Sequence, residues 1–293
     1  MKQFLWIIMV WTSMLAHAFN ASKEQITTLG ITMGYRKCVI TNENSTEAPI
    51  LVVYLHGGSS KGNDNEKQLL EPGTDSIARY LETHGINAIF LIPQCPTDKS
   101  WGGPMNTMLK AMIDRYASEG VADANHIYIF GGSMGGTGTW GMLSAYPNFF
   151  AAAMPVAANP SKTVVENVAT TPAYTVMGTA DAIMKVETAA SFVEELKALD
   201  DDVRMDVEEG WTHETTCIQS YTTTRLEWVF SHRRGTPSAI LRPTSVSQVV
   251  SSQFFSIDGK RLSNPVASKL IIRRDILADG TTKVTKTVAP TSY

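Results

Sequence analysis

The chain has 293 residues, of which 43% are hydrophobic and 18% are charged, and its formal net charge is −3 at pH 7. This length allows one large domain or a domain with a small appendage, and the composition is that of an ordinary globular protein. The charge provides no basic stripe, so neither a nucleic-acid partner nor a role on a membrane surface is expected.

The first 18 residues have the organisation of an export signal. Lys2 precedes an apolar run that ends at Leu15, and Ala16-His17-Ala18 forms an Ala-x-Ala cleavage site. The run is too short to span a membrane comfortably. We expect a cleaved signal peptide over residues 1–18, an exported mature chain and no stable membrane insertion after cleavage. An uncleaved anchor is the alternative.

Apolar runs alternate with segments of helical periodicity, which predicts an α/β protein with a mostly parallel sheet flanked by helices. Strands are expected at 49–55, 86–93, 127–130, 149–158 and 173–177, with an edge strand at 203–207. Helical spacing of apolar residues predicts helices over 105–116 and 186–196 and a final helix over 218–230. Only residues 159–172 separate two of these strands, so no sizeable lid is expected above the sheet.

The composition changes after Arg234. Residues 235–238 read as a linker, and two Asp-Gly turns, at 258–259 and 279–280, each lie between strand-like segments. The sequence therefore predicts a catalytic domain over residues 19–234 and a linker with a small β-rich tail over residues 235–293.

Three cysteines are present, and an odd number leaves at least one thiol unpaired. Cys95 and Cys217 follow predicted strands and are the candidate pair, whereas Cys38 has no such position. None of the three has the spacing of a metal site. We expect no metal and no cofactor.

The pattern Gly131-x-Ser133-x-Gly135 directly follows the apolar strand at 127–130 and leads into a helix. A Gly-x-Ser-x-Gly turn in this context is typical of the nucleophile elbow of α/β-hydrolases. Ser133 is the expected nucleophile; an inert serine in a glycine-rich turn is the alternative.

A histidine should serve as the general base of Ser133. The order in these hydrolases is nucleophile, acid, histidine, and only His213 and His232 follow Ser133 in the chain. His213 comes after the predicted edge strand, on the same rim as Ser133. His232 ends the final helix beside two arginines and is expected to be a solvated cap.

The acid should lie between Ser133 and His213 at the end of a strand. Asp181 meets both conditions and is expected to orient the imidazole. Glu208 and Glu209 flank the histidine loop and are the alternatives. Residues 200–202 are three aspartates that we interpret as a solvated surface.

The oxyanion of the reaction needs backbone donors. We expect the amides of Met134, directly after the nucleophile, and of Gly58, in the His56-Gly57-Gly58 turn. Trp101, Trp140 and Trp211 are candidates for stacking on an aromatic acyl group or a sugar ring, and core packing is the alternative for each.

Several separate motifs between residues 50 and 232 resemble one family of exported esterases, often labelled predicted peptidases. The motifs are His56-Gly57-Gly58 with residues 61–65, residues 92–96 with Trp101, residues 133–136 with 138–140 and 146–147, and Gly178 with Asp181. These esterases are close to the feruloyl, acetyl-xylan and polyhydroxybutyrate-depolymerase-like carbohydrate esterases. The resemblance implies an α/β-hydrolase with a Ser–Asp–His triad and carboxylic-ester chemistry. This chain departs from the family at Glu214 and at Ile183-Met184, where the family usually has an aromatic residue and Val-Pro.

Residues 257–261 in the tail resemble the C-terminal β segments of exported proteins of the Bacteroidetes. The resemblance implies a sorting role, and a plain β appendage is the alternative. Taken together, the sequence predicts an exported serine esterase whose substrate is a small acyl ester or an acylated polysaccharide. A serine peptidase with the same triad and a non-catalytic binding protein on a hydrolase scaffold are the alternatives.

Overall fold

The computed structural model describes residues 21–43, 45–118, 120–199, 202–234, 249–256, 260–262, 270–277 and 282–288. The expected signal peptide and the expected linker lie outside these ranges. The chain divides into two compact units, residues 1–238 and residues 239–293. Each unit is described by itself.

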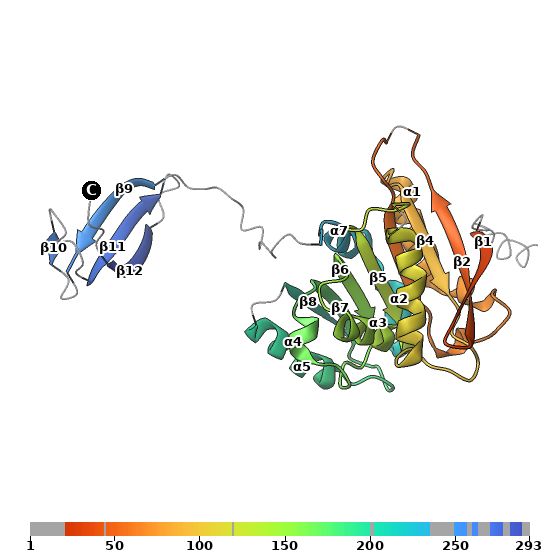
Figure 1. Ribbon diagram of the computed structural model, residues 1–293. Coiled ribbons are helices and arrows are strands. Elements are labelled where there is room, and N and C mark those ends of the chain that lie inside the picture. The colour runs from red at the N-terminus through yellow and green to blue at the C-terminus, as the bar shows by residue number, and fades with distance from the viewer. Residues whose placement is uncertain are drawn as a thin grey trace, which may run out of the picture. The chain divides into compact units, whose positions relative to one another are not determined.

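A single twisted sheet organises the first unit (Figure 1). Among the described residues its eight strands have the order β1-β2-β4-β3-β5-β6-β7-β8. The strands are β1 (Ala21–Thr28), β2 (Ile31–Ile40), β3 (Ile50–Leu55), β4 (Ala88–Pro93), β5 (Ile127–Gly132), β6 (Ala152–Val156), β7 (Ala173–Gly178) and β8 (Val203–Glu208). Strands β3 to β8 run parallel, whereas β1 pairs antiparallel with β2, and β2 antiparallel with β4. The carboxyl ends of β5, β7 and β8 consequently meet at one edge of the sheet.

Helices cover both faces of this sheet. The helices are α1 (Pro72–Thr83), α2 (Pro104–Ala117), α3 (Met134–Ala145), α4 (Val165–Val168), α5 (Val186–Ala198), α6 (His213–Gln219) and α7 (Thr223–Phe230), with short 3₁₀ turns η1 (Gly58–Ser60) and η2 (Lys67–Leu70). Buried residues of α2, α3 and α5 form one core with the sheet, and buried residues of α1 and α7 form the other. Figure 1 shows α2 and α3 in front of the strands.

The strands divide their side chains between the two cores because successive residues point to opposite faces. In β3, Leu51, Val53 and Leu55 belong to the core under α2 and α3, while Val52 and Tyr54 belong to the core under α1 and α7. All five are almost completely buried. Burial on both faces explains why these strands appear in the sequence as continuous apolar runs.

The parallel strands confirm the α/β prediction, and β8 is the edge strand that was expected. Two expectations differ from the structure. The antiparallel hairpin β1–β2 was not predicted, because β1 is largely polar and only one of its residues, Ala21, is buried. The prediction of a single final helix over 218–230 is wrong. The structure has two separate helices, α6 and α7, divided at residues 220–222, where Ser220 and Tyr221 are buried.

The second unit contains a four-stranded antiparallel sheet in the order β10-β9-β11-β12. Its strands are β9 (Val249–Phe255), β10 (Arg261–Leu262), β11 (Leu270–Leu277) and β12 (Thr282–Val288). The pairings β9–β10 and β11–β12 confirm the two hairpins predicted around the Asp-Gly turns. Residues 257–259, which carry most of the tail motif, lie outside the described residues.

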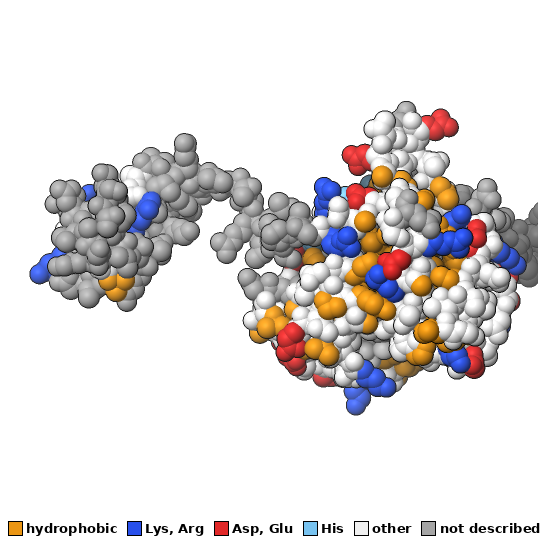
Figure 2. All heavy atoms as spheres, viewed as in Figure 1, with side chains coloured by type: hydrophobic (Ala, Val, Ile, Leu, Met, Phe, Trp, Pro, Cys, Tyr) orange, Lys and Arg blue, Asp and Glu red, His pale blue; other side chains and the backbone are white. Residues whose placement is uncertain are grey.

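Two observations concern the surface. None of the helices in the described part of the chain has the length and apolar character needed to cross a bilayer. Figure 2 shows Lys and Arg interspersed with Asp and Glu on the visible face of the first unit, with no broad field of one sign among the coloured side chains.

Candidate active site

The candidate nucleophile occupies a strained turn between β5 and α3. Ser133 has φ 57° and ψ −119°, a conformation that is costly for a residue with a side chain. The turn is held by Ser133 N–H, which donates to Val156 O (3.0 Å), and by Thr137 N–H, which donates to Ser133 O (3.0 Å). Gly135 must be glycine, because an added Cβ would overlap the carbonyl oxygen of Leu55 on β3. Close packing of α3 against the sheet therefore produces the elbow.

The structure brings together Ser133 from the turn after β5, Asp181 from the loop after β7 and His213 from the start of α6. His213 Nε2 lies 2.8 Å from Ser133 Oγ, and His213 Nδ1 lies 2.7 Å from Asp181 Oδ2. A carboxylate can only accept a hydrogen bond, so Nδ1 carries the proton and Nε2 is free to take one from Ser133. The Asp181 carboxylate is completely buried, while the His213 side chain retains 16% exposure. The arrangement is that of a nucleophile, a general base and an orienting acid.

The second oxygen of Asp181 is also engaged. Oδ1 accepts hydrogen bonds from the backbone amides of Ile183 and Met184, each at 2.8 Å. The two residues that depart from the family pattern thus supply the amides that fix the carboxylate. Proline has no amide hydrogen, so a Val-Pro pair could make only the first of these two bonds, and Met184 supplies a second donor to Asp181 Oδ1.

The loop after β7, which carries Asp181 (the acid loop), and the loop between β8 and His213 (the histidine loop) are hydrogen-bonded to each other. Thr179 N–H donates to Glu208 O (3.0 Å), Ala180 N–H donates to Trp211 O (3.0 Å), and Gly210 N–H donates to Thr179 Oγ1 (2.8 Å). These bonds continue the β7–β8 pairing beyond the ends of the strands. The distance between Asp181 and His213 is therefore set by backbone contacts and not by the two side chains alone.

The alternative acids and the alternative base lie in other contacts. Glu208 forms an ion pair with Arg225, which also binds Asp206. Glu209 is exposed and makes no triad contact. The remaining alternative, His232, was expected to be a solvated cap. That expectation is wrong, because the His232 side chain is only 15% exposed and its Nε2 lies 3.0 Å from an Asp202 oxygen.

The two expected oxyanion donors begin the two helical segments beside Ser133. Met134 is the first residue of α3 and Gly58 is the first residue of η1. The amides at the start of a helix have no partner within it, so both are available to a developing negative charge. The two segments lie close together, since a Cβ added to Gly57 would be in van der Waals contact with Ser133 Cβ, at 3.7 Å.

The loop after β3 that carries Gly58, here called the oxyanion loop, is anchored by a buried histidine. Cys95 N–H donates to His56 Nε2 (2.9 Å), so the other ring nitrogen is protonated and donates to Gly57 O (2.6 Å). Burial lowers the pKa of His56 from 6.5 to about 4, which keeps the ring neutral. Trp101 Nε1 donates to the backbone oxygen of His56 (3.0 Å). The ring thus joins the end of β3 to the segment after β4.

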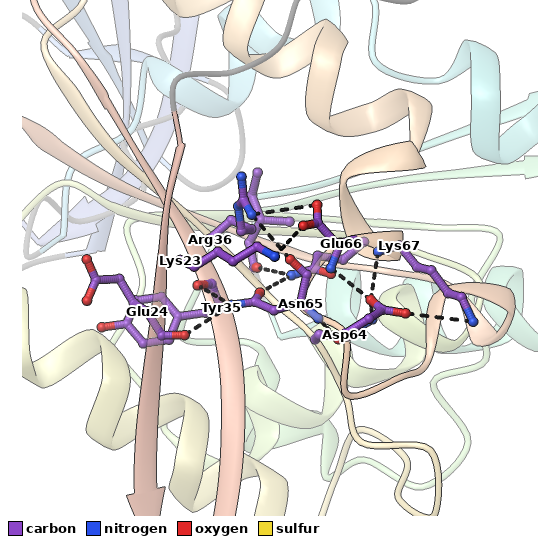
Figure 3. A network of polar contacts seen from close by, with 11 residues as sticks. Lys23, Glu24, Tyr35, Arg36, Asp64, Asn65, Glu66 and Lys67 are labelled. Atoms are coloured by element: carbon purple, nitrogen blue, oxygen red, sulfur yellow. Dashed lines mark hydrogen bonds and ion pairs between the residues drawn. The ribbon is translucent and has the colours of Figure 1, made fainter.

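A polar network holds the far end of the same loop (Figure 3). Gln94 Nε2 donates to Asp64 Oδ1 (2.9 Å), and Gln94 Oε1 accepts from Asn65 N–H (2.7 Å). Asn65 Nδ2 donates to Glu24 O and Tyr35 O on the β1–β2 hairpin, both at 3.1 Å. The hydrogen bond from Gln94, followed by those from the Glu66 and Lys67 amides, lowers the pKa of Asp64 to about 2. The hairpin that the sequence did not predict therefore supports the oxyanion loop.

The three tryptophans do not share one position. Trp140 has 0% exposure and packs edge-on against Phe192 in the core, so the expectation that it contacts substrate is wrong. Trp101 is buried at 8% exposure, with its indole bound to the oxyanion loop. Trp211 is partly exposed and adjoins the acid loop through its backbone oxygen. Of the three, Trp211 alone is not buried; it packs against the core under α1 and α7, with Arg225 Cζ 5.9 Å from its ring centroid.

The expected pairing of Cys95 with Cys217 is wrong: all three cysteines are free. Cys95 is buried behind the oxyanion loop, whereas Cys217 lies on α6, where a Cβ added to Gly132 would be 3.5 Å from its Sγ. Burial, followed by the nearby carboxylates of Glu71 and Asp181, raises the pKa of Cys217 to about 12. Both thiols therefore act as small packing groups. In the described part of the chain no His, Cys, Asp and Glu side chains cluster as metal ligands would.

Comparison with solved structures places this fold among the α/β-hydrolases. A thermostable esterase matches with a TM-score of 0.66 and 28% identity over 73% of this chain, and the chain spans 63% of that esterase. An esterase of Pyrococcus furiosus matches with a TM-score of 0.57 and 17% identity over 74% of this chain and 94% of its own. A ferulic acid esterase matches with a TM-score of 0.58 and 13% identity over 72% of this chain and 98% of its own. No protein-family model and no curated protein sequence matches the chain.

Proposed function

We propose that this protein is a serine carboxylic-ester hydrolase. The observation that carries the proposal is the continuous hydrogen-bonded line from Asp181 through His213 to Ser133 on the elbow. The likeness to the thermostable esterase, at 28% identity, supports the same chemistry. A binding protein on this scaffold would have no need of the strained serine or of the buried acid.

The geometry supports a two-step reaction. Ser133 Oγ attacks the ester carbonyl as His213 Nε2 takes its proton, and Asp181 stabilises the imidazolium that forms. The amides of Met134 and Gly58 receive the negative charge on the carbonyl oxygen. His213 then protonates the leaving alcohol, which departs and leaves an acyl group on Ser133. A water molecule, deprotonated by His213, releases the acid and restores the serine.

For the substrate, we propose an acyl group carried on plant polysaccharide, such as ferulate or acetate, met by an exported enzyme. The segment between β6 and β7 contains only the four-residue helix α4, which leaves room for a bulky substrate. Ile183, beside the triad acid, is 66% exposed, and Trp211 is partly exposed. These apolar groups suit an aromatic acyl group or a sugar ring. The signal-like residues 1–18 support export.

A substrate panel tests the proposal. Methyl ferulate, acetylated xylan, p-nitrophenyl acetate and a peptide anilide should be compared with the wild-type protein and with Ser133→Ala. We expect hydrolysis of esters, little or no hydrolysis of the anilide, and loss of nearly all activity in the variant. A fluorophosphonate probe should label the wild type and not Ser133→Ala. Labelling that persists at another serine, or faster cleavage of the anilide than of every ester, would contradict the assignment.

A further inference from the structure

The carboxylate of Glu71 lies directly behind the oxyanion loop. Glu71 precedes α1 and has the extended backbone of an N-cap residue (φ −72°, ψ 123°), yet its side chain makes no capping hydrogen bond to that helix. Instead Oε1 accepts hydrogen bonds from Gly57 N–H (3.1 Å) and from Ser60 Oγ (2.6 Å). A residue well placed to cap a helix thus uses its acceptor on the neighbouring loop.

These two contacts assign different tasks to adjacent glycine amides. The Gly57 amide is bound to Glu71 and cannot reach a substrate oxygen, whereas the Gly58 amide begins η1 and has no partner within it. A Cβ added to Gly57 would lie 3.5 Å from Glu71 Oε1 and 3.7 Å from Ser133 Cβ. Gly57 therefore lies close to both the carboxylate and the nucleophile. Binding its N–H fixes the orientation of the backbone that presents the next amide.

The hydrogen bonds of Glu71 hold the loop, but its negative charge does not help the reaction. Among the described residues no cation forms an ion pair with it, and after burial its charge is the next cause that raises the pKa of Tyr54 and of Cys217. A negative charge near the oxyanion hole opposes the charge that develops there. Because both contacts use the same oxygen, an uncharged acceptor of the same length can make them.

We propose that Glu71 is a positioning residue for the oxyanion hole: its Oε1, acting as an acceptor, holds Gly57 and Ser60 so that the Gly58 amide faces the reacting carbonyl. The inference rests on the proposed ester hydrolysis. If Glu71 acts in this way, kcat depends on the length of its side chain and does not depend on its charge.

Two substitutions separate length from charge. Glu71→Gln keeps an oxygen at the same reach without the charge, and kcat should stay within about threefold of the wild type. Glu71→Asp keeps the charge and withdraws the oxygen from the loop, and kcat should fall by about 10²-fold, as expected when an oxyanion donor is misplaced. Aspartate is also a good N-cap, so the melting temperature of Glu71→Asp should be unchanged or higher. KM should change little in either variant.

A trifluoromethyl ketone provides the second readout, because its tetrahedral adduct places an oxyanion in the hole. Its affinity should fall in parallel with kcat in Glu71→Asp and stay near the wild-type value in Glu71→Gln. Asp75→Asn is the matched control, because Asp75 is an exposed acid in the first turn of α1 that pairs with Arg79. This control should leave kcat unchanged.

The proposal is overturned if Glu71→Asp keeps its kcat, or if Glu71→Gln loses as much kcat as Glu71→Asp. A fall in kcat that follows a matching fall in melting temperature would also overturn it, since that pattern belongs to a residue needed only for folding. Failure of the proposed function looks different: the wild-type protein would then lack esterase activity, or Ser133→Ala would retain it.

Discussion

Replacing Asp181 with Asn should abolish most of the activity for a reason that the structure makes specific. The two side chains have the same shape, but Asn carries one oxygen and one NH₂ group. Asp181 Oδ1 accepts from the amides of Ile183 and Met184, so the single oxygen of Asn will occupy that position. The NH₂ group must then face His213 Nδ1. This nitrogen has to accept a hydrogen bond, so the proton moves to Nε2.

With the proton on Nε2, His213 cannot take the proton of Ser133. In serine hydrolases with the same kind of triad this substitution lowers kcat by about 10⁴-fold, which corresponds to roughly 5 kcal/mol of lost transition-state stabilisation. We expect a similar loss here, because the two backbone amides leave the Asn side chain no second orientation. The fold should be preserved, since Asn fills the same volume.

The assay is the initial rate on p-nitrophenyl acetate, with the melting temperature of each variant measured in parallel. Glu208→Gln is the control, because Glu208 is the alternative acid and is paired with Arg225. Its kcat should fall far less than that of Asp181→Asn. A rate for Asp181→Asn within tenfold of the wild type, or a greater loss in Glu208→Gln, would refute this account of the triad.

Four further outcomes are expected. In Gly178→Ala the added methyl would overlap Trp211 O and lie 2.5 Å from Thr216 Oγ1. We therefore expect kcat to fall at least tenfold and the free energy of unfolding to fall by about 1–3 kcal/mol. Ester kinetics and thermal melting measure the two effects. His56 has a pKa of about 4 in the folded protein and 6.5 in the unfolded chain. Between pH 6.5 and pH 4 the unfolded chain therefore binds a proton at His56 that the folded protein does not, so the free energy of unfolding should fall as the pH drops through this range. The expected loss is on the order of 3 kcal/mol, and denaturant titrations should show it weakened in His56→Gln. Excess chelator should leave the esterase rate unchanged, and restoration of a lost rate by zinc would contradict the triad mechanism. A chain ending at Arg234 should fold and keep its turnover on a small ester, because the triad and the eight-stranded sheet precede this point; a large drop in melting temperature would show that the tail belongs to the catalytic domain.

Much of the catalytic unit could be predicted from local sequence signals. The parallel strands other than the edge strand β8 are buried on both faces, so each is a continuous apolar run that can be recognised without knowledge of its neighbours. The elbow also leaves a local signal, the Gly-x-Ser-x-Gly pattern directly after an apolar strand, although at Gly135 the lack of room for a side chain comes from the end of β3. The order of nucleophile, acid and histidine then reduced the candidate bases to two, and parallel strands brought the candidate acid to the same edge.

Other features were decided only by the tertiary structure. A tryptophan in a sequence is equally compatible with the core and with a substrate surface, and only the packing of α3 in the core, with Phe192 of α5 edge-on to the ring, buries Trp140 completely. Strand β1 lies at the edge of the sheet and is largely polar, and the apolar residues of β2, such as Met33 and Tyr35, are interrupted by polar ones, so neither strand forms a continuous apolar run.

The support of the oxyanion loop was likewise invisible in the sequence. Glu71 follows Gly57 by fourteen positions, and nothing local distinguishes it from an ordinary acid at the start of a helix. Gln94 and Asn65 also act across loops that only the folded chain brings together. Apolar periodicity and tight turns are local properties that the sequence by itself determines. The partner of a buried polar group depends on which segments meet, and only the assembled sheet decides that.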